Sequence, residues 1–496
     1  MNRILEIEKL CGGLSTKEKN KINDFFAGLE TRIELPPVGK NLLISHFVNA
    51  FEYYLDKGLS VDKIIKTINY EHLGDFYMNK SRMFYTLDNA AIIYPLSMRY
   101  GQMMMFRVSA EMKEDINPII LQLALDFTIK RFPTFSAIVK RGFFWHYLET
   151  TNNVINVEEE TDIPCRPMSL VLRSKGSIRV LYYKKRISFE LFHSISDGTG
   201  AITFLKALIA EYLTLMGKKI TLDETVLDID ETVADEELVN EFNNAKGNDN
   251  LSTFMDKKSL QLDGKLCDLN ITKILHFKLN SKQLKSVSKG YGGTVTAYIL
   301  AIMFLAARDS ISKKKGIINI QVPVNMRKFN GSKTLRNYSM YFNASMNIND
   351  IKDKKELVTE IDKQLKEKGS EANMNQMMRT TEKLINTLAY VPMILKNPII
   401  QLIYSYFSNS IICLTLSNLG VIKTPKKMEN EIDSFALDFP PGRPNRATAS
   451  LATFKDNCIL GIIKSNRDDT FENRIYDYLL EDKLDLEVEG SVEYES

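Results

Sequence analysis

One stretch, residues 178–217, limits the folds open to this chain more than any other. Residues 178–183 and 187–192 are rich in β-branched and aromatic side chains, and a short basic run between them predicts a hairpin. A glycine-containing turn follows, and residues 201–216 carry apolar side chains at helical spacing. The rest of the chain also mixes helical and strand-like segments, with no repeat of 20–50 residues. The predicted fold class is therefore α/β (α+β).

The turn between this hairpin and helix contains the strongest candidate site. His193 continues the apolar face of the second strand by its period of two, so it is expected to point toward a core or a dry cavity. Histidine is the natural general base near neutral pH. Asp197 either orients the ring or braces the loop through an arginine, and Gly198, with Gly200, permits a tight turn. The alternative interpretation is a buried histidine beside an N-capping aspartate.

Composition narrows the classes of function. The 496 residues include 65 basic and 62 acidic ones, a net charge of +3 that does not favour nucleic-acid binding. The five cysteines include no CxxC pair, and the N-terminus has no secretory signal, so reduced thiols, no zinc or other metal, and a cytoplasmic location are expected. The longest apolar run, Ala297 to Ala307, is too short to span a bilayer.

Changes in composition and hydrophobic pattern along the chain predict four parts. Residues 1–80 are expected to form a helical extension, and residues 81–220 a first mixed half. Residues 221–270 are acidic and polar and predict a solvated crossover linker, before a second mixed half at 271–496. The apolar region 388–407 is broken by prolines and polar residues. It is interpreted as packed helices lining a pocket, with peripheral membrane contact as the alternative.

Several ordered segments carry a resemblance over about residues 83–490. The segment 192–200 resembles the HxxxDG motif of the chloramphenicol acetyltransferase-like, CoA-dependent acyltransferases, and the chain is most similar to bacterial alcohol acetyltransferase-like members. A second histidine, usual before this motif in condensation domains, is replaced by Phe192. The other matching segments are Leu87-Asp88-Asn89-Ala90-Ala91, Tyr94-Pro95, Arg131-Phe132-Pro133, Gly142-Phe143-Phe144-Trp145, Pro323-Val324-Asn325-Met326-Arg327, Lys333-Thr334-Leu335-Arg336-Asn337 and Ser417-Asn418-Leu419-Gly420.

The resemblance implies two acyltransferase half-domains of α/β sandwich type around a central tunnel, the first carrying the motif. It implies that His193 is the base and that Asp197 is structural, paired with an arginine of the other half, for which Arg327 is the candidate. Asn337, Ser417 and Asn418 match segments that line the tunnel, and one of them is a candidate to support the oxyanion. No tightly bound cofactor and no metal are implied, and acyl-CoA is a co-substrate.

The sequence therefore predicts an enzyme that transfers an acyl group, acetyl or another short or medium chain, from acyl-CoA to an alcohol or amine. Two alternatives remain open. In one, the same fold uses a thioester on an acyl carrier protein, as in condensation reactions. In the other, the protein is not catalytic, and its tunnel holds a hydrophobic ligand.

Overall fold

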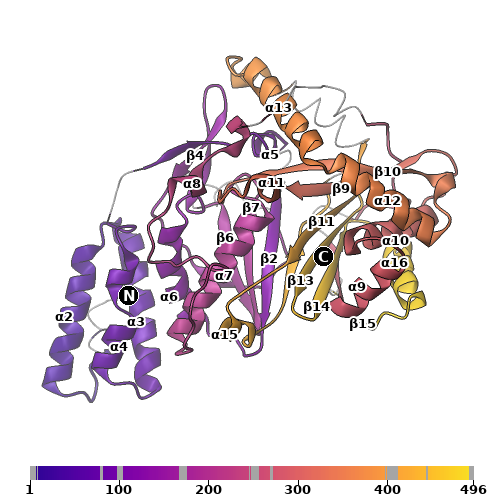
Figure 1. The fold of residues 1–496 in the computed structure, drawn as a ribbon. Helices are drawn as coiled ribbons and strands as arrows, with labels where there is room; N and C mark the ends of the chain where they lie inside the picture. Colours follow the sequence, from indigo (N-terminus) through magenta and orange to yellow (C-terminus); the bar gives the residue numbers. More distant parts are fainter. Residues whose placement is uncertain are drawn as a thin grey trace.

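The computed structural model describes residues 7, 9–78, 82–97, 104–166, 176–244, 246, 256–267, 272–396, 398, 411–442 and 445–490. Two large sheets lie side by side with helices packed against them, and a third, smaller sheet lies above the first (Figure 1). Two hydrophobic cores correspond to the two halves of the molecule. The predicted α/β fold class is confirmed.

The first sheet has the strand order β12-β2-β7-β6-β5. Its neighbours are antiparallel except β5 and β6, and helices α6 (Pro118–Thr128) and α7 (Gly198–Leu215) pack together beside it. Its core includes a stack of Phe135, Phe189 and Phe204 rings. The strands are β2 (Met105–Met112), β5 (Val157–Glu159), β6 (Ile178–Tyr183), β7 (Arg186–Phe192) and β12 (Ile432–Asp438).

The second sheet has the order β10-β9-β11-β13-β14-β8-β15, in which β11 is parallel to both of its neighbours. Helix α10 is the centre of the second core, because Ala297 to Ala307 are all buried. The strands are β8 (Lys273–Asn280), β9 (Ile317–Asn325), β10 (Ser339–Asn347), β11 (Leu414–Val421), β13 (Ala447–Phe454), β14 (Asn457–Lys464) and β15 (Leu486–Gly490). The helices are α9 (Ser281–Gly290), α10 (Val295–Asp309), α11 (Arg327–Asn330), η6 (Ile348–Asp350), α12 (Lys354–Lys368), α13 (Glu371–Thr387), α15 (Lys426–Glu429) and α16 (Thr470–Glu481).

A small sheet, β1-β4-β3, stands above the first sheet (Figure 1). Two of its strands form a hairpin, because the backbone turns at Gly142, whose amide donates to the Trp145 carbonyl at 3.0 Å. Its strands are β1 (Phe84–Thr86), β3 (Ala137–Arg141) and β4 (His146–Thr150). Near it, the short helix α5 (Ile93–Ser97) leads toward the candidate site.

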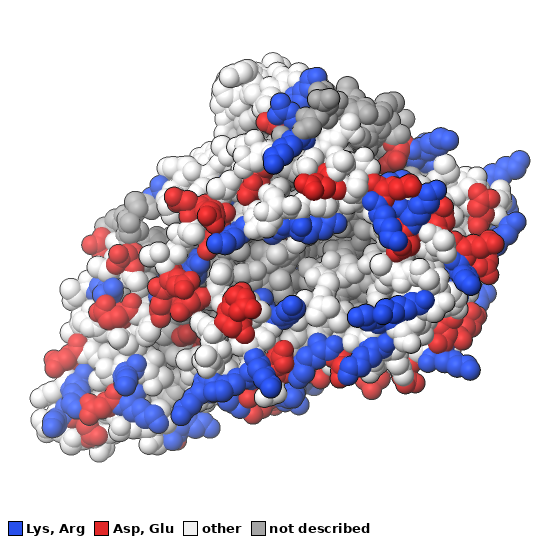
Figure 2. Space-filling model, viewed as in Figure 1, with Lys and Arg blue, Asp and Glu red and all other residues white. Residues whose placement is uncertain are grey.

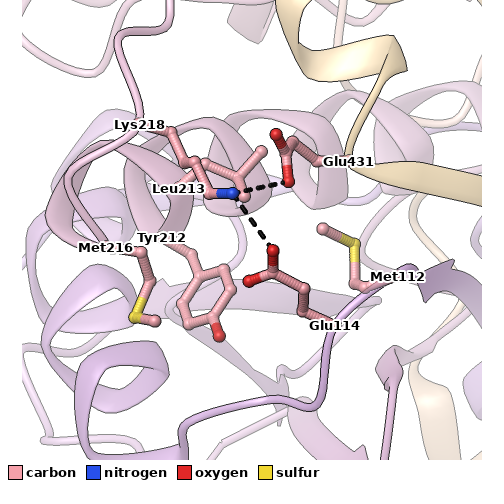
Figure 3. A pocket seen from close by; sticks show the side chains of 7 residues that line it. All are labelled: Met112, Glu114, Tyr212, Leu213, Met216, Lys218 and Glu431. Atoms are coloured by element: carbon pink, nitrogen blue, oxygen red, sulfur yellow. Dashed lines mark hydrogen bonds and ion pairs between the residues drawn. The ribbon is translucent and has the colours of Figure 1, made fainter.

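Strand β12 ties the two halves together. It belongs to the predicted second half-domain, yet it pairs with β2 of the first sheet, with Ala436 opposite Ser109. At the end of this junction, the Lys218 ammonium bridges Glu114 of the first half, at 3.2 Å, and Glu431 of the second, at 3.1 Å (Figure 3). The small pocket around Lys218 is therefore part of a structural junction between the halves.

The helices of the N-terminal region share their core with the first half. Helices α2 (Thr16–Arg32), α3 (Pro37–Asp56), α4 (Val61–Thr67) and η1 (Tyr70–Leu73) belong to the same hydrophobic cluster as the first sheet. Ser15 caps α2 with Glu18 in a capping box. Helix α3 packs on α6, where His46 Nδ1 lies 2.8 Å from the buried Asp126. These helices are an integral layer of the first half.

The composition of the acidic stretch after α7 predicts a solvated linker. In the structure, part of this stretch is buried. Glu237 is buried and receives two hydrogen bonds from Arg131, at 2.5 and 2.7 Å, because a buried guanidinium needs a counter-charge. The Leu335 amide also donates to the Glu237 carbonyl, which anchors the stretch against a loop of the second half. The short helices of this stretch are α8 (Asp235–Leu238) and η4 (Glu241–Asn244), and η2 (Ile129–Arg131) continues α6.

Within the described ranges, no single helix has the length and hydropathy that a membrane span needs. Helices α9 and α10 reach this length and hydropathy only when they are taken together, and the pair is bent by 77°. Helix α10 lies inside the second core. Figure 2 shows the surface hollowed near the middle of the viewed face, between the two halves.

Candidate active site

The turn between β7 and α7 brings the first half against the second. Asp197 is the N-cap of α7 and accepts hydrogen bonds from the amides of Thr199 and Gly200, both at 3.1 Å. A Cβ at Gly198 would lie 2.8 Å from Leu419 Cδ2, at the end of β11. The Leu419 side chain could shift, but a Cβ at Gly200 would lie 2.4 Å from the Leu335 backbone oxygen of the second half, so glycine is required at 200.

His193 follows β7 directly and lies among aromatic rings. Tyr94 of α5 stacks on the imidazole with 4.3 Å between ring centroids, and Phe106 of β2 lies 4.8 Å away. Burial of the ring lowers the pKa of His193 below its usual 6.5, against weaker opposing effects of its own backbone, Asp197 and Asn337. The imidazole is therefore neutral at neutral pH, which is the state a general base requires.

Asn337, from the loop before β10, holds His193 by two contacts. Its Nδ2 donates to the His193 carbonyl at 2.9 Å, and its Oδ1 lies 3.2 Å from His193 Nδ1. The first bond fixes the orientation of the amide, so an oxygen faces Nδ1 and that nitrogen carries the proton. Nε2 of His193 is then the unprotonated nitrogen, free to accept a proton.

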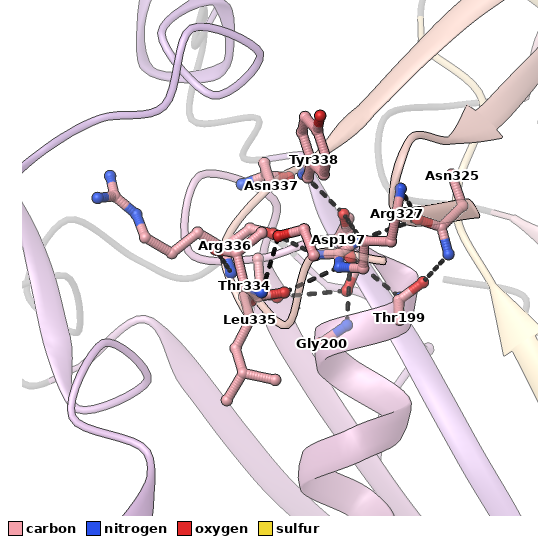
Figure 4. Close-up of polar contacts among 12 residues, drawn as sticks. Asp197, Thr199, Gly200, Asn325, Arg327, Thr334, Leu335, Arg336, Asn337 and Tyr338 are labelled. Carbon is pink, nitrogen blue, oxygen red and sulfur yellow. Dashed lines mark hydrogen bonds and ion pairs between the residues drawn. The ribbon is translucent and has the colours of Figure 1, made fainter. Parts of the chain in front are cut away.

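The Asp197 carboxylate accepts hydrogen bonds both from its own turn and from the second half (Figure 4). Its Oδ2 lies 2.8 Å from Arg327 Nη1 and accepts a hydrogen bond from the Tyr338 amide at 2.8 Å. Arg327 also donates to the carbonyls of Thr334 and Arg336, at 2.8 and 2.6 Å. The structure thus contains the ion pair expected between Asp197 and Arg327, and this pair fixes the loop that carries Asn337.

A second buried ion pair supports the same loop, and the sequence did not single it out as part of the site. Arg336 Nε lies 3.0 Å from Asp88 Oδ1, and Asp88 Oδ2 accepts a hydrogen bond from the Asn337 amide at 3.1 Å. Burial raises the pKa of Asp88 to about 7, although Arg336 opposes this shift. Both residues lie in segments that carry the family resemblance, but only the fold shows that they meet.

The fold is shared with solved acyltransferase structures. Neither a protein-family model nor a curated protein matches the chain. TRI3 trichothecene 15-O-acetyltransferase from Fusarium sporotrichioides is 13% identical and aligns over 81% of this chain and 96% of its own, with a TM-score of 0.52. TRI101 of the same organism, complexed with coenzyme A and T-2, is 11% identical over 82% and 99%, with a TM-score of 0.51. The first condensation domain of the calcium-dependent antibiotic synthetase is 12% identical over 81% and 96%, with a TM-score of 0.53.

The chain has the chloramphenicol acetyltransferase-like fold. The predicted resemblance is confirmed at the level of this fold, and the arrangement of two α/β halves is that of the three similar structures.

The second half supplies the remaining predicted residues at the end of β11. Asn418 donates to Thr296 Oγ1 at 3.0 Å, and its Oδ1 accepts a hydrogen bond from the Gly420 amide at 2.7 Å. Gly420 has a φ of 72°, and the register of β11 against β13 shifts between Asn418 and Val421, so the contact with Gly420 belongs to a β-bulge. Both ends of the Asn418 amide are thus engaged, one with Thr296 of α10 and one within the bulge, which favours a structural role. Ser417 pairs with Ser450 in the sheet, and its support of an oxyanion stays a prediction.

The cysteines of the chain are poorly suited to act as nucleophiles. All five cysteines lie in the described part of the chain, where they are buried and form no disulfide. Burial raises the pKa of the Cys413 thiol to about 12 and that of Cys165 well above its usual range, so neither is a thiolate at neutral pH. Among the residues that the structure describes, no group of three or more His, Cys, Asp or Glu side chains could hold a metal ion.

Proposed function

We propose that the protein transfers an acyl group from acyl-CoA to an alcohol or amine, with His193 as the general base. The observation that carries this proposal is the contact between His193 Nδ1 and Asn337, which leaves Nε2 unprotonated at the junction of the two halves. The O-acetyltransferase and the coenzyme A complex of similar fold support the choice of donor and acceptor.

The reaction follows from the protonation state of this ring. His193 Nε2 accepts the proton of the acceptor O–H or N–H while that oxygen or nitrogen attacks the thioester carbonyl carbon. The carbonyl π-electrons move to its oxygen and form a tetrahedral intermediate. When the carbonyl re-forms, the C–S bond breaks, and the imidazolium returns the proton to the CoA sulfur. The acyl ester or amide and free CoA are the products, and no covalent acyl-enzyme forms.

The decisive measurement is release of free CoA thiol from acetyl-CoA and longer acyl-CoA donors, with a panel of alcohols and amines. His193→Ala should lower kcat by about 10²–10⁴-fold, since a positioned general base contributes that much. His72→Ala is the matched control, because that histidine is partly exposed and pairs with Asp230. Normal turnover by His193→Ala would overturn the mechanism.

A carrier-protein thioester is the second candidate donor, because a condensation domain aligns with this chain as well as the acetyltransferases do. If this donor is correct, a loaded carrier protein supports turnover that depends on His193, whereas free acyl-CoA does not. Product formation with free acyl-CoA at the same rate or faster would exclude this alternative.

A further inference from the structure

Five large apolar side chains project into solvent where the β3–β4 turn meets the chain after α13. We call them the apolar tip: Phe143, Phe144, Tyr390, Ile394 and Leu395, which are 71%, 38%, 87%, 74% and 63% exposed. Single exposed apolar residues are ordinary on protein surfaces, but a contiguous group of this size marks an interaction surface.

The apolar tip has a fixed framework beneath its exposed side chains. The Met393 amide donates to the Phe143 carbonyl at 2.9 Å, and the rings of Phe144 and Tyr390 meet edge to face at 6.3 Å. Below them, the Lys396 ammonium lies 3.1 Å from the centre of the Trp145 ring and donates to the Leu388 carbonyl at 3.0 Å. The β3–β4 turn and the chain after α13 are thus fixed to each other by these contacts. The fold therefore sets the outward direction of the apolar side chains.

The charge around the apolar tip is mainly basic. Residues 138–148 and 383–396 contain Lys140, Arg141, Lys383 and the buried Lys396 and no aspartate or glutamate. The adjoining Glu382 pairs with Arg379 at 2.6 Å, and Glu149 is buried. In Figure 2 the uppermost lobe, where α13 lies, is largely white and carries basic side chains with little acid. Elsewhere on this face the two signs are interspersed.

We propose that the apolar tip docks onto an anionic lipid bilayer. Aromatic and aliphatic side chains flanked by lysine and arginine are the combination that enters the headgroup region, where the rings bury apolar area and the cations meet lipid phosphates and carboxylates. Figure 1 shows α13 and the small sheet on the same side as α5, whose Tyr94 stacks on His193.

The single tryptophan of the chain allows docking to be measured directly. Trp145 lies at the base of the apolar tip, so its fluorescence should shift to shorter wavelength when vesicles are added. The wild-type protein is titrated with phosphatidylcholine vesicles and with vesicles that also contain phosphatidylserine, and flotation gives the bound fraction. Binding should be at least about tenfold stronger to the anionic vesicles, and added salt should weaken it.

Two variants separate the apolar and the electrostatic contributions to vesicle binding. Phe143→Ser combined with Ile394→Ser should lower vesicle binding by at least about tenfold, because two side chains no longer bury apolar area. Arg141→Glu combined with Lys383→Glu should remove the preference for anionic vesicles. Val38→Ser combined with Leu480→Ser, which changes exposed apolar residues on other elements, is the matched control and should bind normally. Thermal unfolding of each variant checks that the fold is intact.

Three results would overturn the proposal: no binding of the wild-type protein, equal binding to neutral and anionic vesicles, or unchanged binding by Phe143→Ser with Ile394→Ser. A wild-type dimer that this variant dissociates, without vesicle binding, would assign the tip to self-association instead. His193→Ala should bind vesicles like the wild type, so the outcome is independent of the proposed acyl transfer.

Discussion

A single amide, that of Asn337, connects the histidine of the first half to a loop of the second. Because its contacts select the tautomer of His193, the base depends on a residue 144 positions away in the chain. Asn337 is a positioning residue, and its effect on the histidine pKa separates that role from a merely structural one.

Asn337→Asp should move the acid limb of the pH–kcat/KM profile to higher pH. Burial holds the pKa of His193 below 6.5, and activity falls as pH decreases through that pKa because the protonated ring is no longer a base. A carboxylate in contact with Nδ1 stabilises the imidazolium and raises this pKa. Asn337→Ala is the control and should lower kcat without the upward displacement. Identical profiles for Asn337→Asp and the wild type would argue against the contact.

The pair Asp197–Arg327 should be coupled in a double-mutant cycle. Each single change, Asp197→Asn or Arg327→Met, should lower the free energy of unfolding by about 3–5 kcal/mol, because it leaves a buried charge without its partner. The double variant should lose less than the sum of the two. Urea unfolding measures all four proteins. Simple additivity would show that the two side chains do not interact across the halves.

At the scale of elements, β12 depends on contacts to both sheets. His276 of β8 lies 2.8 Å from Asp438 at the end of β12, so an ion pair links the second sheet to the strand that completes the first. Burial alone would lower the pKa of His276, but the Asp438 carboxylate outweighs it and raises the pKa above 6.5.

This pair should make the protein less stable as pH rises. A histidine whose pKa is raised in the folded state contributes stability that is complete below the unfolded pKa of about 6.5 and is lost as pH rises through the folded value. The loss should be about 1.5–3 kcal/mol, the contribution of a charge-assisted hydrogen bond. Urea unfolding between about pH 6 and pH 9 measures it. His276→Gln should be less stable at low pH and should show a flatter dependence.

Elements with local signals were predictable from the sequence, and their partners were not. The β7–turn–α7 unit and helices α9 and α10 follow from apolar periodicity, caps and glycines, which act within a few residues. The partner of β12 depends on contacts between Ala436 and Ser109, more than 300 residues apart, where periodicity carries no information. Likewise, the family motif located His193, but the Asp88–Arg336 pair required the assembled loop.

For the whole molecule, the N-terminal helices are a structural layer and share one core with the first half. Phe47 of α3 is fully buried, and its ring meets Phe127 of α6 at 5.9 Å. His46 Nδ1 lies 2.8 Å from Asp126 beside this contact, and burial raises the pKa of the aspartate. The core of the first half therefore includes a segment that precedes its first strand.

Phe47→Ala should lower the free energy of unfolding by about 3–5 kcal/mol, because it leaves a cavity between α3 and α6. The transition should remain single if the helices and the first half unfold together. Val38→Ala, at an exposed position of the same helix, is the control and should change stability by less than about 0.5 kcal/mol. An early separate transition for Phe47→Ala would show that the helices unfold independently.

Strand β12 also has a consequence for the order of events during synthesis. Because chains emerge from the ribosome N-terminus first, β2 is made long before residues 432–438 exist. Until then the first sheet ends at β2, whose unpaired backbone can bond to other nascent chains. The protein therefore cannot complete its first half until most of the second has been translated, and aggregation during expression should be most sensitive to substitutions in β2 and β12.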